Sequence, residues 1–573
     1  MRPVIPSDCF LVGSKAPDDA GFTKPYTGEA MSQQDERDGV SRRRVLQAAA
    51  SIVPLHFGSQ LATALARFGM ATTTQQLGDD LLALGAREAV ARIRSGDITA
   101  EAYVTQLLKQ YYTHKDLNVA NAIDGARVLE AARAVDRSRA RGDRLGPAAG
   151  LPFAVKDQIS VAGYPTTGGN GALKGYIPKR HAVVVERVVR AGGIPFCMTS
   201  LPDMTVIDGL MHQISSHSKS FGAVHNPYDP TRIPGGSSGG SGAILAARIV
   251  PAALGLDTNG SVRCPSAFCG VTGLRPSTYT IENAIKGTSR KRYSDEGLVI
   301  PPARRLDTIG PMARAVSDVA FLDMLITGEA APTVDLRAAR IAVPRPDYWE
   351  RDDVDPGVTD VILQAFAKLR EAGCTLVEID FEGEVRSIVG TLFQPTPASV
   401  FAGDGMNAPR PTSLTMARWL REHAPGVTVE QMYGDRPIRD GRRSFPPVEE
   451  QVRVLKEAAR RYAEIYRSHG VLAIAFPTAP IVATTIRPGG PKEPLGELIT
   501  IKGKQVEEGR VAPQNLFIAP RVGAPALSIP AGLSQGLPVG LELDALPGND
   551  SKLLGLGVAA QAVIGRIPPP SFS

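Results

Sequence analysis

Cysteine and histidine are scarce in this chain of 573 residues, and their spacing excludes the common metal sites. The eight histidines include no HExxH sequence, and the five cysteines include no CxxC pair. Those spacings are typical of zinc sites and of metal-dependent hydrolases. The sequence therefore implies no metal ion, and no motif implies an organic cofactor. We expect buried thiols at Cys197 and Cys374, whereas the sequence leaves open whether Cys264 and Cys269 form a disulfide.

Long apolar runs are also missing. The apolar stretch that ends near Ala66 is interrupted by Pro54, His56 and Gln60. A membrane-spanning helix needs about 20 mainly apolar residues, so we expect no stable membrane span. No stripe of basic residues alternates with aromatic ones, although 64 Lys and Arg against 58 Asp and Glu give a net charge of +6. The sequence therefore predicts no nucleic-acid partner.

The N-terminal segment differs in character from the rest of the chain. Residues 1–40 are polar and show no helical or strand periodicity, so we expect them to be disordered. Ser41–Gln47 (SRRRVLQ) resembles a twin-arginine export signal, and Ala64-Leu-Ala66 is a candidate cleavage site. We therefore expect residues 1–66 to be a signal and the enzyme to be periplasmic or secreted. The alternative is a basic arm before the first helix of a cytoplasmic protein.

The remaining chain alternates between helical spacing and short buried apolar runs. With 43% hydrophobic and 21% charged residues, it has the composition of a globular enzyme. Such alternation predicts an α/β fold, with a mixed central sheet covered by helices on both faces in one large domain, 67–573. Residues 385–447 lose the alternation, and we interpret them as a cap that shapes the substrate site. The expected helices cover 81–93, 183–190, 241–249, 358–371 and 448–467, with another beginning after Thr99, and the expected strands cover 151–155, 194–198, 252–256, 339–343, 375–379, 471–476, 526–529 and 538–543.

Two glycine-rich loops and one lysine carry the chemistry of this sequence. The first glycine loop, 233–241 (IPGGSSGGS), contains Ser237, and the second glycine loop, 255–263 (GLDTNGSVR), contains Ser261. Lys156 follows the expected strand 151–155. Glycine lets the backbone approach a ligand closely, so such loops can direct hydroxyl and N–H groups at one reacting atom. No histidine is close in sequence and no Gly-x-Ser-x-Gly turn precedes Ser261, which argues against a Ser–His–Asp hydrolase.

This arrangement resembles the amidase signature family, hydrolases that use a Ser–Ser–Lys triad. Pro152–Asp157 resembles the lysine motif of the family, and His225–Ser241 together with Asp257–Pro276 resembles its serine-rich core. The resemblance extends over roughly residues 75–573 and implies a single amidase-signature domain.

The resemblance also implies a role for each residue of the triad. Ser261 is the nucleophile, Lys156 is the base, and Ser237 transfers protons between them after a cis Gly236–Ser237 peptide. Backbone N–H groups of four residues form the oxyanion hole, and three further residues support the triad. The oxyanion residues are Thr258, Asn259, Gly260 and Ser261, and the supporting residues are Ser238, Asp257 and Arg263.

One residue departs from the family pattern. Asn259 stands where the family usually has the first of two glycines before the nucleophile. Asparagine tolerates a positive φ better than other non-glycine residues, which would preserve the loop. Alternatively, its side chain narrows the site or contacts the leaving group.

A lysine base must be neutral to accept a proton. A free lysine has a pKa of about 10.4, and burial lowers this value because it disfavours the charged form. We therefore expect Lys156 to be buried. The neighbouring Asp157 would oppose this effect if it faced the amine, so we expect its carboxylate to point away.

The substrate is less constrained than the reaction. The segments 246–254, 306–314 and 536–543 look like the branch that contains mandelamide and indoleacetamide hydrolases, which points to aryl or arylalkyl amides, anilides or carbamates. Met204, Val206 and Ile207 are candidates for an acyl pocket, with core packing as the alternative. The rival functions are the glutaminase component of a tRNA-dependent amidotransferase, which needs partner subunits, and a non-catalytic binding protein. Esterase side activity and a homodimer are left open.

Overall fold

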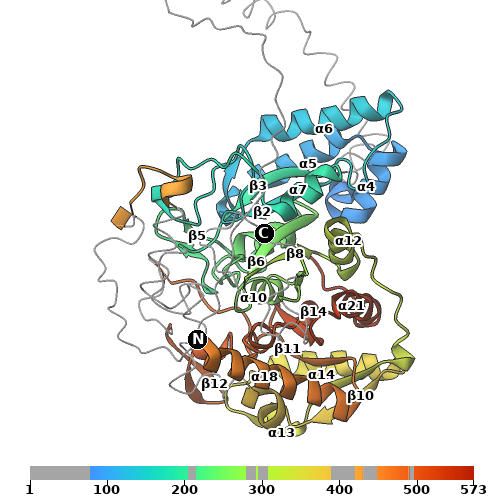
Figure 1. Cartoon of the computed structure of the whole chain (residues 1–573), viewed down its shortest axis with the longest axis vertical. Coiled ribbons are helices and arrows are strands. Elements are labelled where there is room, and N and C mark those ends of the chain that lie inside the picture. Colours follow the sequence, from blue (N-terminus) through green and yellow to red (C-terminus); the bar gives the residue numbers. More distant parts are fainter. Residues whose placement is uncertain are drawn as a thin grey trace, which may run out of the picture. The chain divides into compact units, whose positions relative to one another are not determined.

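A mixed β-sheet organises the part of the chain that the structure describes (Figure 1). The computed structural model describes residues 78–203, 214–278, 292–293, 307–388, 420–428, 430–431, 448–487, 490 and 496–572. Within these residues the sheet has eleven strands in the order β1-β3-β2-β6-β8-β7-β14-β15-β11-β9-β10. The strands are β1 (Ala120–Ile123), β2 (Pro152–Lys156), β3 (Ile194–Thr199), β6 (Ala252–Asp257), β7 (Thr272–Arg275), β8 (Thr308–Ala313), β9 (Arg340–Pro344), β10 (Thr375–Ile379), β11 (Ala473–Pro477), β14 (Ala526–Ser534) and β15 (Leu537–Asp544).

Parallel and antiparallel pairs coexist in this sheet. Strand β2 runs parallel to both β3 and β6, and β9 runs parallel to both β10 and β11. Strands β7, β8, β14 and β15 join these two parallel groups through antiparallel pairs. The predicted mixed α/β sheet is therefore confirmed. Two further hairpins, β4 (His217–Ser218) with β5 (Gly222–Ala223) and β12 (Leu498–Ile501) with β13 (Lys504–Glu507), lie outside it.

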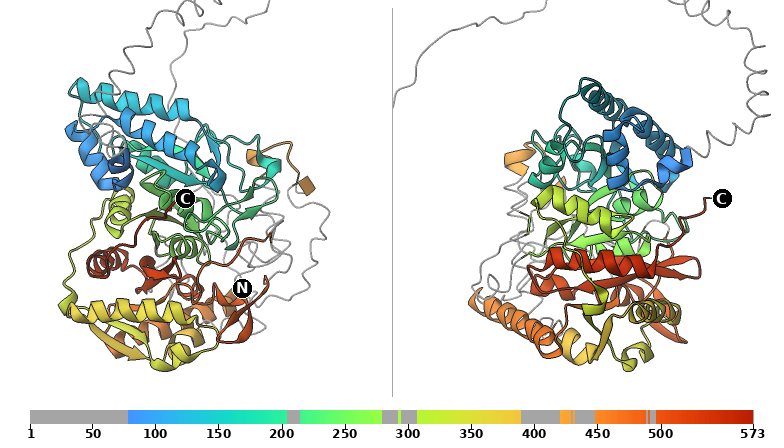
Figure 2. Two further views of the ribbon diagram at one scale, coloured as in Figure 1. Left: turned by 180° about the vertical axis from the view of Figure 1, so that it is seen from behind. Right: turned by 90° about the vertical axis from the view of Figure 1, so that its right-hand side faces the viewer.

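Helices cover the sheet on both faces. In Figures 1 and 2, α4 to α7 gather near one end of the sheet, and α14 and α18 lie near the other. The helices with the largest share of the packing are α4 (Ala86–Ser95), α5 (Ala100–Thr113), α6 (Gly125–Ala140), α7 (Val183–Arg190), α9 (Gly239–Ala246), α10 (Arg263–Phe268), α12 (Val316–Thr327), α14 (Pro356–Glu371), α18 (Val448–His469), α20 (Ile518–Val522) and α21 (Asp550–Ile564).

Strand β2 shows why both faces must be covered. Successive side chains of a strand point to opposite faces. Ala154 accordingly belongs to a hydrophobic cluster with α5 and α9, whereas Phe153 and Val155 belong to a second cluster with α7 and α12. All five residues of β2 are buried, so the strand carries Lys156 into the interior.

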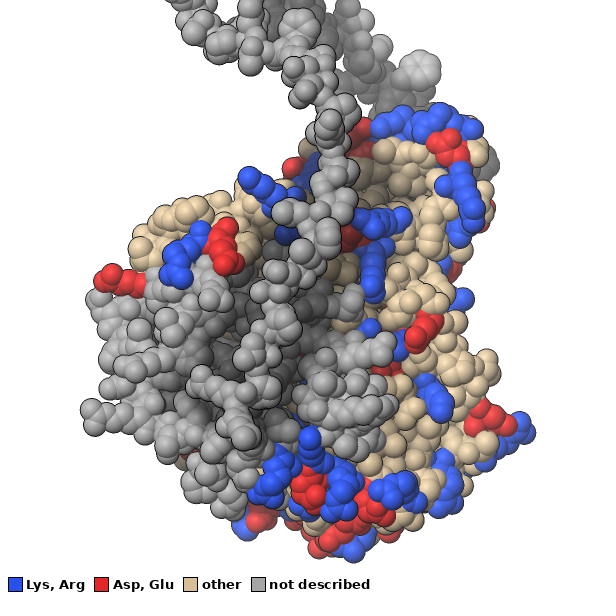
Figure 3. All heavy atoms as spheres, in the orientation of Figure 1, with Lys and Arg blue, Asp and Glu red and all other residues tan. Residues whose placement is uncertain are grey.

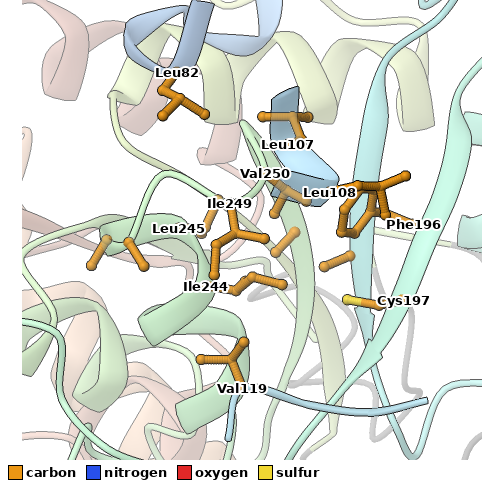
Figure 4. Close-up of a cluster of buried hydrophobic side chains, with 14 of the residues drawn as sticks. Leu82, Leu107, Leu108, Val119, Phe196, Cys197, Ile244, Leu245, Ile249 and Val250 are labelled. Atoms are coloured by element: carbon orange, nitrogen blue, oxygen red, sulfur yellow. The ribbon is translucent and has the colours of Figure 1, made fainter. Parts of the chain in front are cut away.

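The first of these clusters holds α9 in place, the helix that begins within the first glycine loop. Leu107 and Leu108 from α5 pack with Ile244 and Leu245 from α9 and with Phe196 from β3 (Figure 4). Every residue of α9 is buried. Its glycines are required by close contact, since a Cβ atom on Gly240 would lie 2.5 Å from the Ser200 carbonyl oxygen. Small residues therefore let α9 lie directly against the ends of neighbouring elements.

Most elements expected from the sequence occur at their predicted positions. Helix α7 covers 183–190 and strand β10 covers 375–379, as predicted, and the Thr99 side chain caps α5 by accepting from the Ala102 N–H at 3.0 Å. Helix α9 begins two residues before the prediction and ends three residues before it. The sequence reasoning missed β1, β7, β8, α6, α10, α12 and α21.

Several predictions lie wholly or largely outside the described residues. These are the N-terminal signal, the pocket candidates Met204, Val206 and Ile207, and most of the predicted cap 385–447. Within that cap, Leu420 and Ala424 are buried against Leu173. None of the described helices is long and apolar enough to cross a membrane. On the face seen in Figure 3, charges of both signs are interspersed among the described residues.

Candidate active site

The sheet topology brings the predicted lysine and the second glycine loop to one edge. Lys156 ends β2 and Asp257 ends β6, and these strands are parallel neighbours. The carboxyl ends of parallel strands meet at the same edge of a sheet, where ligand sites commonly form. The first glycine loop reaches this edge because α9 packs against β2 and β6.

Lys156 and Ser237 are in direct contact. The Lys156 Nζ lies 2.7 Å from the Ser237 Oγ and 3.4 Å from the carbonyl oxygen of Leu256. The Lys156 side chain is fully buried, and Ser237 is 3% exposed. The Gly236–Ser237 peptide is cis, as the family resemblance implies. The structure thus joins two of the three predicted triad side chains.

Burial sets the charge state of this lysine. It lowers the pKa of the Lys156 amine from 10.5 to about 7, although the carboxylates of Asp307 and Asp257 act in the opposite direction. Desolvation disfavours the ammonium form because water no longer stabilises its charge. A large fraction of the amine is therefore neutral at neutral pH and can accept a proton.

Ser238 ties the two glycine loops together. Its N–H donates to the Ser261 carbonyl oxygen at 3.1 Å. Its hydroxyl lies 3.4 Å from the Leu256 carbonyl oxygen and 3.3 Å from the Leu256 nitrogen, at the end of β6. Ser261 is 9% exposed, more than Ser237 or Lys156. Ser238 thus contacts both Ser261 and the end of β6, and Ser261 is the predicted triad residue with the greatest access to solvent.

Asp257 organises the second glycine loop through hydrogen bonds from four residues. Its carboxylate accepts from the N–H groups of Gly260 at 2.9 Å and Val262 at 3.1 Å. It also accepts from Arg263 Nε at 3.1 Å and from Arg275 at 3.0 Å. Burial alone would raise the pKa of this carboxyl, but the charges of Arg263 and Arg275 hold it well below its usual range. Asp257 and Arg263 thus brace the loop, as predicted.

Because of the same network, the Gly260 N–H is not available as an oxyanion donor in this structure, contrary to expectation. Because the Gly260 N–H donates to Asp257, it is already committed in this conformation. Gly260 has φ 106°, and a Cβ atom there would lie 2.5 Å from the Leu516 Cβ, so only glycine fits. The expected oxyanion donors that remain are the N–H groups of Thr258, Asn259 and Ser261.

Asn259 does not adopt a positive φ, which was one of the two expectations for this residue. The non-glycine residues with positive φ in the described chain are Asn118, Ser216, Arg248, Lys502 and Gln535. Asn259 therefore does not use the left-handed tolerance of asparagine. Instead, its Oδ1 accepts from an Arg521 NH group at 2.6 Å.

Asp157 is directed away from the chemistry, as expected. Its carboxylate accepts from the Asn121 side chain at 2.9 Å, from the Thr167 N–H at 2.7 Å and from the Thr167 hydroxyl. Burial raises the pKa of Asp157 to about 7, and these hydrogen bonds act against that rise. Asp157 thus anchors the turn after β2.

The cysteines of the site are thiols. Cys264 and Cys269 are free and buried, which settles the question of a disulfide between them in this structure. The Cys269 thiol instead contacts the Pro234 carbonyl oxygen of the first glycine loop at 3.3 Å. Cys197 and Cys374 are buried thiols, as predicted.

The sequence reasoning missed four charged residues around the second glycine loop. Asp307 accepts from the Thr258 hydroxyl, Glu542 pairs with Arg263, Arg275 donates to Asp257, and Arg521 donates to Asn259. A sequence signal existed for one of them, because Glu542 interrupts the mainly apolar run of β15. In the described ranges no group of His, Cys, Asp and Glu side chains is arranged to hold a metal ion.

Comparisons with known proteins show which family the chain belongs to. The Amidase family profile matches residues 102–554. One component of the glutamyl-tRNA(Gln) amidotransferase of Chloroflexus aurantiacus is 34% identical over 502 residues, which cover 82% of this chain and 95% of that protein. The mandelamide hydrolase of Pseudomonas putida is 30% identical over 512 residues, covering 85% and 92%. A crystal structure of an amidase superposes with a TM-score of 0.65 and 26% identity, covering 84% of this chain and all of that one. The chain therefore belongs to the amidase family, and it is a hydrolase of carbon–nitrogen bonds with the amidase-signature fold.

Proposed function

We propose that this amidase forms an acyl-enzyme on Ser261 and hydrolyses aryl or arylalkyl amides, anilides or carbamates. The observation that carries the mechanism is the 2.7 Å contact between Ser237 and a fully buried Lys156. An amine with a pKa of about 7 is close to ideal for a general base that works near neutral pH.

Acylation begins when the Ser261 Oγ bonds to the carbonyl carbon of the substrate. The Ser261 proton passes to the Ser237 Oγ, and the Ser237 proton passes to the neutral Lys156 Nζ. The C–N bond then breaks, and the leaving nitrogen takes a proton back from this relay. Ammonia or an amine departs, and the acyl group stays on Ser261 as an ester.

Deacylation uses the same relay with water as the nucleophile. Water attacks the ester carbonyl and gives up its proton through Ser237 to Lys156. The bond between the acyl carbon and the Ser261 Oγ breaks, and the Oγ regains a proton as the carboxylic acid leaves. The N–H groups of Thr258, Asn259 and Ser261 are the proposed donors to the negative oxygen of both tetrahedral intermediates.

Similarity to two enzymes that are named for amides with an aromatic group supports the substrate class. The chain is 30% identical to mandelamide hydrolase of Pseudomonas putida and 30% identical to indoleacetamide hydrolase of Agrobacterium vitis. The test is a panel of phenylacetamide, an anilide, an aryl carbamate and a peptide amide, incubated with the full chain and with Ser261→Ala. We expect turnover that depends on Ser261 for the aryl members. Preference for the peptide amide would reject the substrate class, and turnover by Ser261→Ala would reject the mechanism.

A glutaminase within a larger enzyme is the second candidate, because the chain is 34% identical to one component of the glutamyl-tRNA(Gln) amidotransferase of Chloroflexus aurantiacus. A glutaminase should release ammonia from glutamine and should gain activity with its partner subunits. We expect glutamine to be a poor substrate in comparison with phenylacetamide. The opposite ranking would favour the glutaminase.

We also propose that the N-terminal segment directs export. Arg42 and Arg43 occupy the twin-arginine positions of the motif. Replacing both by lysine should retain the chain in the cytoplasm of a Gram-negative host and leave its N-terminus intact. Fractionation and intact mass measure the result, and unchanged periplasmic delivery of the variant would contradict the proposal.

A further inference from the structure

The Asn259 side chain has no role in the relay, although it lies two residues before Ser261. It occupies the position where amidase-signature proteins usually have glycine. The backbone of Asn259 does not need an unusual φ. What the asparagine adds is therefore a side-chain amide, and this amide accepts from Arg521 at 2.6 Å.

The second glycine loop is anchored firmly at its C-terminal side. Asp257 holds the N–H groups of Gly260 and Val262, and Arg263 is fully buried between Asp257 and Glu542. At the N-terminal side, the Thr258 hydroxyl donates to Asp307. Between these anchors the Asn259 side chain provides a third attachment, in the stretch that presents the proposed oxyanion donors.

Arg521 belongs to a segment that packs directly against this loop. Arg521 lies on α20 and is 4% exposed, with its guanidinium carbon 5.4 Å from the centre of the Phe517 ring. In the same segment the Leu516 carbonyl oxygen accepts from Arg263 at 2.8 Å, and the Leu516 side chain leaves no space for a Cβ atom on Gly260. The segment 516–521 therefore contacts the loop at Asn259, Gly260 and Arg263.

We propose that Arg521 is a positioning residue for amide hydrolysis, which holds the Asn259 side chain and so fixes the peptide groups that stabilise the oxyanion. A guanidinium donating to an amide oxygen forms a charge-assisted bond with fixed planar geometry. Its positive charge also polarises the loop in the direction that favours a developing negative oxygen. The inference rests on the proposed role of Ser261 as the nucleophile.

The test is a double-mutant cycle between the two side chains. Arg521→Met removes the donor and the charge, Asn259→Ala removes the acceptor without altering Arg521, and the third variant combines them. The readout is the rate at which a fluorophosphonate labels Ser261, a reaction in which Oγ bonds to phosphorus and fluoride leaves. This rate reports nucleophile activation and oxyanion stabilisation without requiring the natural substrate. Steady-state kinetics on phenylacetamide separate kcat from KM.

We expect each single variant to label about 10- to 100-fold more slowly, with a loss in kcat and a KM within about threefold of the parent. The double variant should be no slower than the slower single variant, because both remove the same interaction. Arg521→Lys should recover part of the rate. Arg139→Met is a matched control, since Arg139 donates to the carbonyl oxygens of Ile93 and Ile98 away from the site. It should lower the melting temperature and leave the labelling rate unchanged.

Three results would overturn the inference. If the losses in labelling rate were additive in the double variant, Arg521 and Asn259 would act independently. If Asn259→Ala labelled as fast as the parent, the hydrogen bond between the two side chains would have no role in catalysis, even if Arg521→Met failed to fold. A loss confined to melting temperature would leave Arg521 with a structural role alone. Undiminished labelling of Ser261→Ala would instead refute the proposed nucleophile, so the two failures are distinguishable.

Discussion

Lys156 and Arg263 are both fully buried basic side chains that contact the second glycine loop, yet their charge states differ. Arg263 forms ion pairs with Asp257 and Glu542, and its pKa is raised because these carboxylates outweigh the effect of burial. The Lys156 amine contacts a hydroxyl and a carbonyl oxygen, and burial lowers its pKa to about 7. A paired cation stays charged and serves as a brace, whereas a cation that burial neutralises can serve as a base.

The largest expected effect comes from removing the neutral amine from the relay. Lys156→Ala should lower kcat for phenylacetamide by at least about a thousandfold, because groups that act as one catalytic unit lose most of their effect together. Ser261→Ala should fall to a similar level, and the double variant should lose no more than either alone. Ammonia release measures this. Substantial activity in Lys156→Ala would mean that another group activates Ser261.

The second expected effect is on stability and concerns the paired cation. Arg263→Met leaves the Asp257 carboxylate without a main partner in the interior. Breaking a buried ion pair from one side costs about 3–5 kcal/mol, so the free energy of unfolding should fall by that amount. Urea unfolding followed by circular dichroism measures it. A loss below about 1 kcal/mol would show that Arg275 and backbone N–H groups alone keep Asp257 satisfied.

Removing the neutral lysine should have the opposite effect and raise the free energy of unfolding. Holding the amine near a pKa of about 7, against 10.5 in the unfolded chain, opposes folding by about 4 kcal/mol at pH 7. The unfolded state binds more protons between these values, so this cost decreases as the pH rises from about 7 to above 10.5. Lys156→Met should therefore be more stable than the parent by about 2–3 kcal/mol at pH 7, after the loss of the hydrogen bonds to Ser237 and Leu256.

The pH dependence of that gain identifies its cause. The difference in unfolding free energy between Lys156→Met and the parent should shrink when urea unfolding is repeated near pH 10. A gain that is equal at both pH values would come from better packing of methionine rather than from removal of a buried amine.

The sequence predicted the features that depend on local patterns and missed those that depend on contacts between distant residues. The alternation of apolar runs and helical spacing predicted the sheet, because each strand and helix carries its own burial pattern. Lys156 and both serines were identified because they lie in local motifs. Arg521 and Asp307 act on the second glycine loop from more than 40 positions away, and no local pattern records such contacts. Strand β7 was missed because it has only four residues, of which Leu274 alone is a large apolar one, and β8 was missed because Gly310 and Pro311 interrupt its apolar pattern.

The smallest expected effect concerns the carboxylates that face the Lys156 amine. The activity of the parent should rise with pH through about 7, as Lys156 loses its proton. Asp307 and Asp257 both favour the charged lysine, and Asp307 is the larger contributor. Asp307→Asn keeps an oxygen for the Thr258 hydroxyl and removes the negative charge, so the pKa of Lys156 should fall further. The rise in kcat/KM should then occur at a lower pH, by roughly half a unit to one unit.

A distant carboxylate provides the control for this shift. Asp136 accepts from the backbone N–H groups of Ala100 and Glu101, away from the site, so Asp136→Asn should leave the pH of the rise unchanged. If Asp307→Asn instead lowers the rate equally at all pH values, Asp307 acts by holding Thr258 and has no electrostatic effect on the base. In that case burial and the charge of Asp257 alone would set the pKa of Lys156, and the contrast between Lys156 and Arg263 would not involve Asp307.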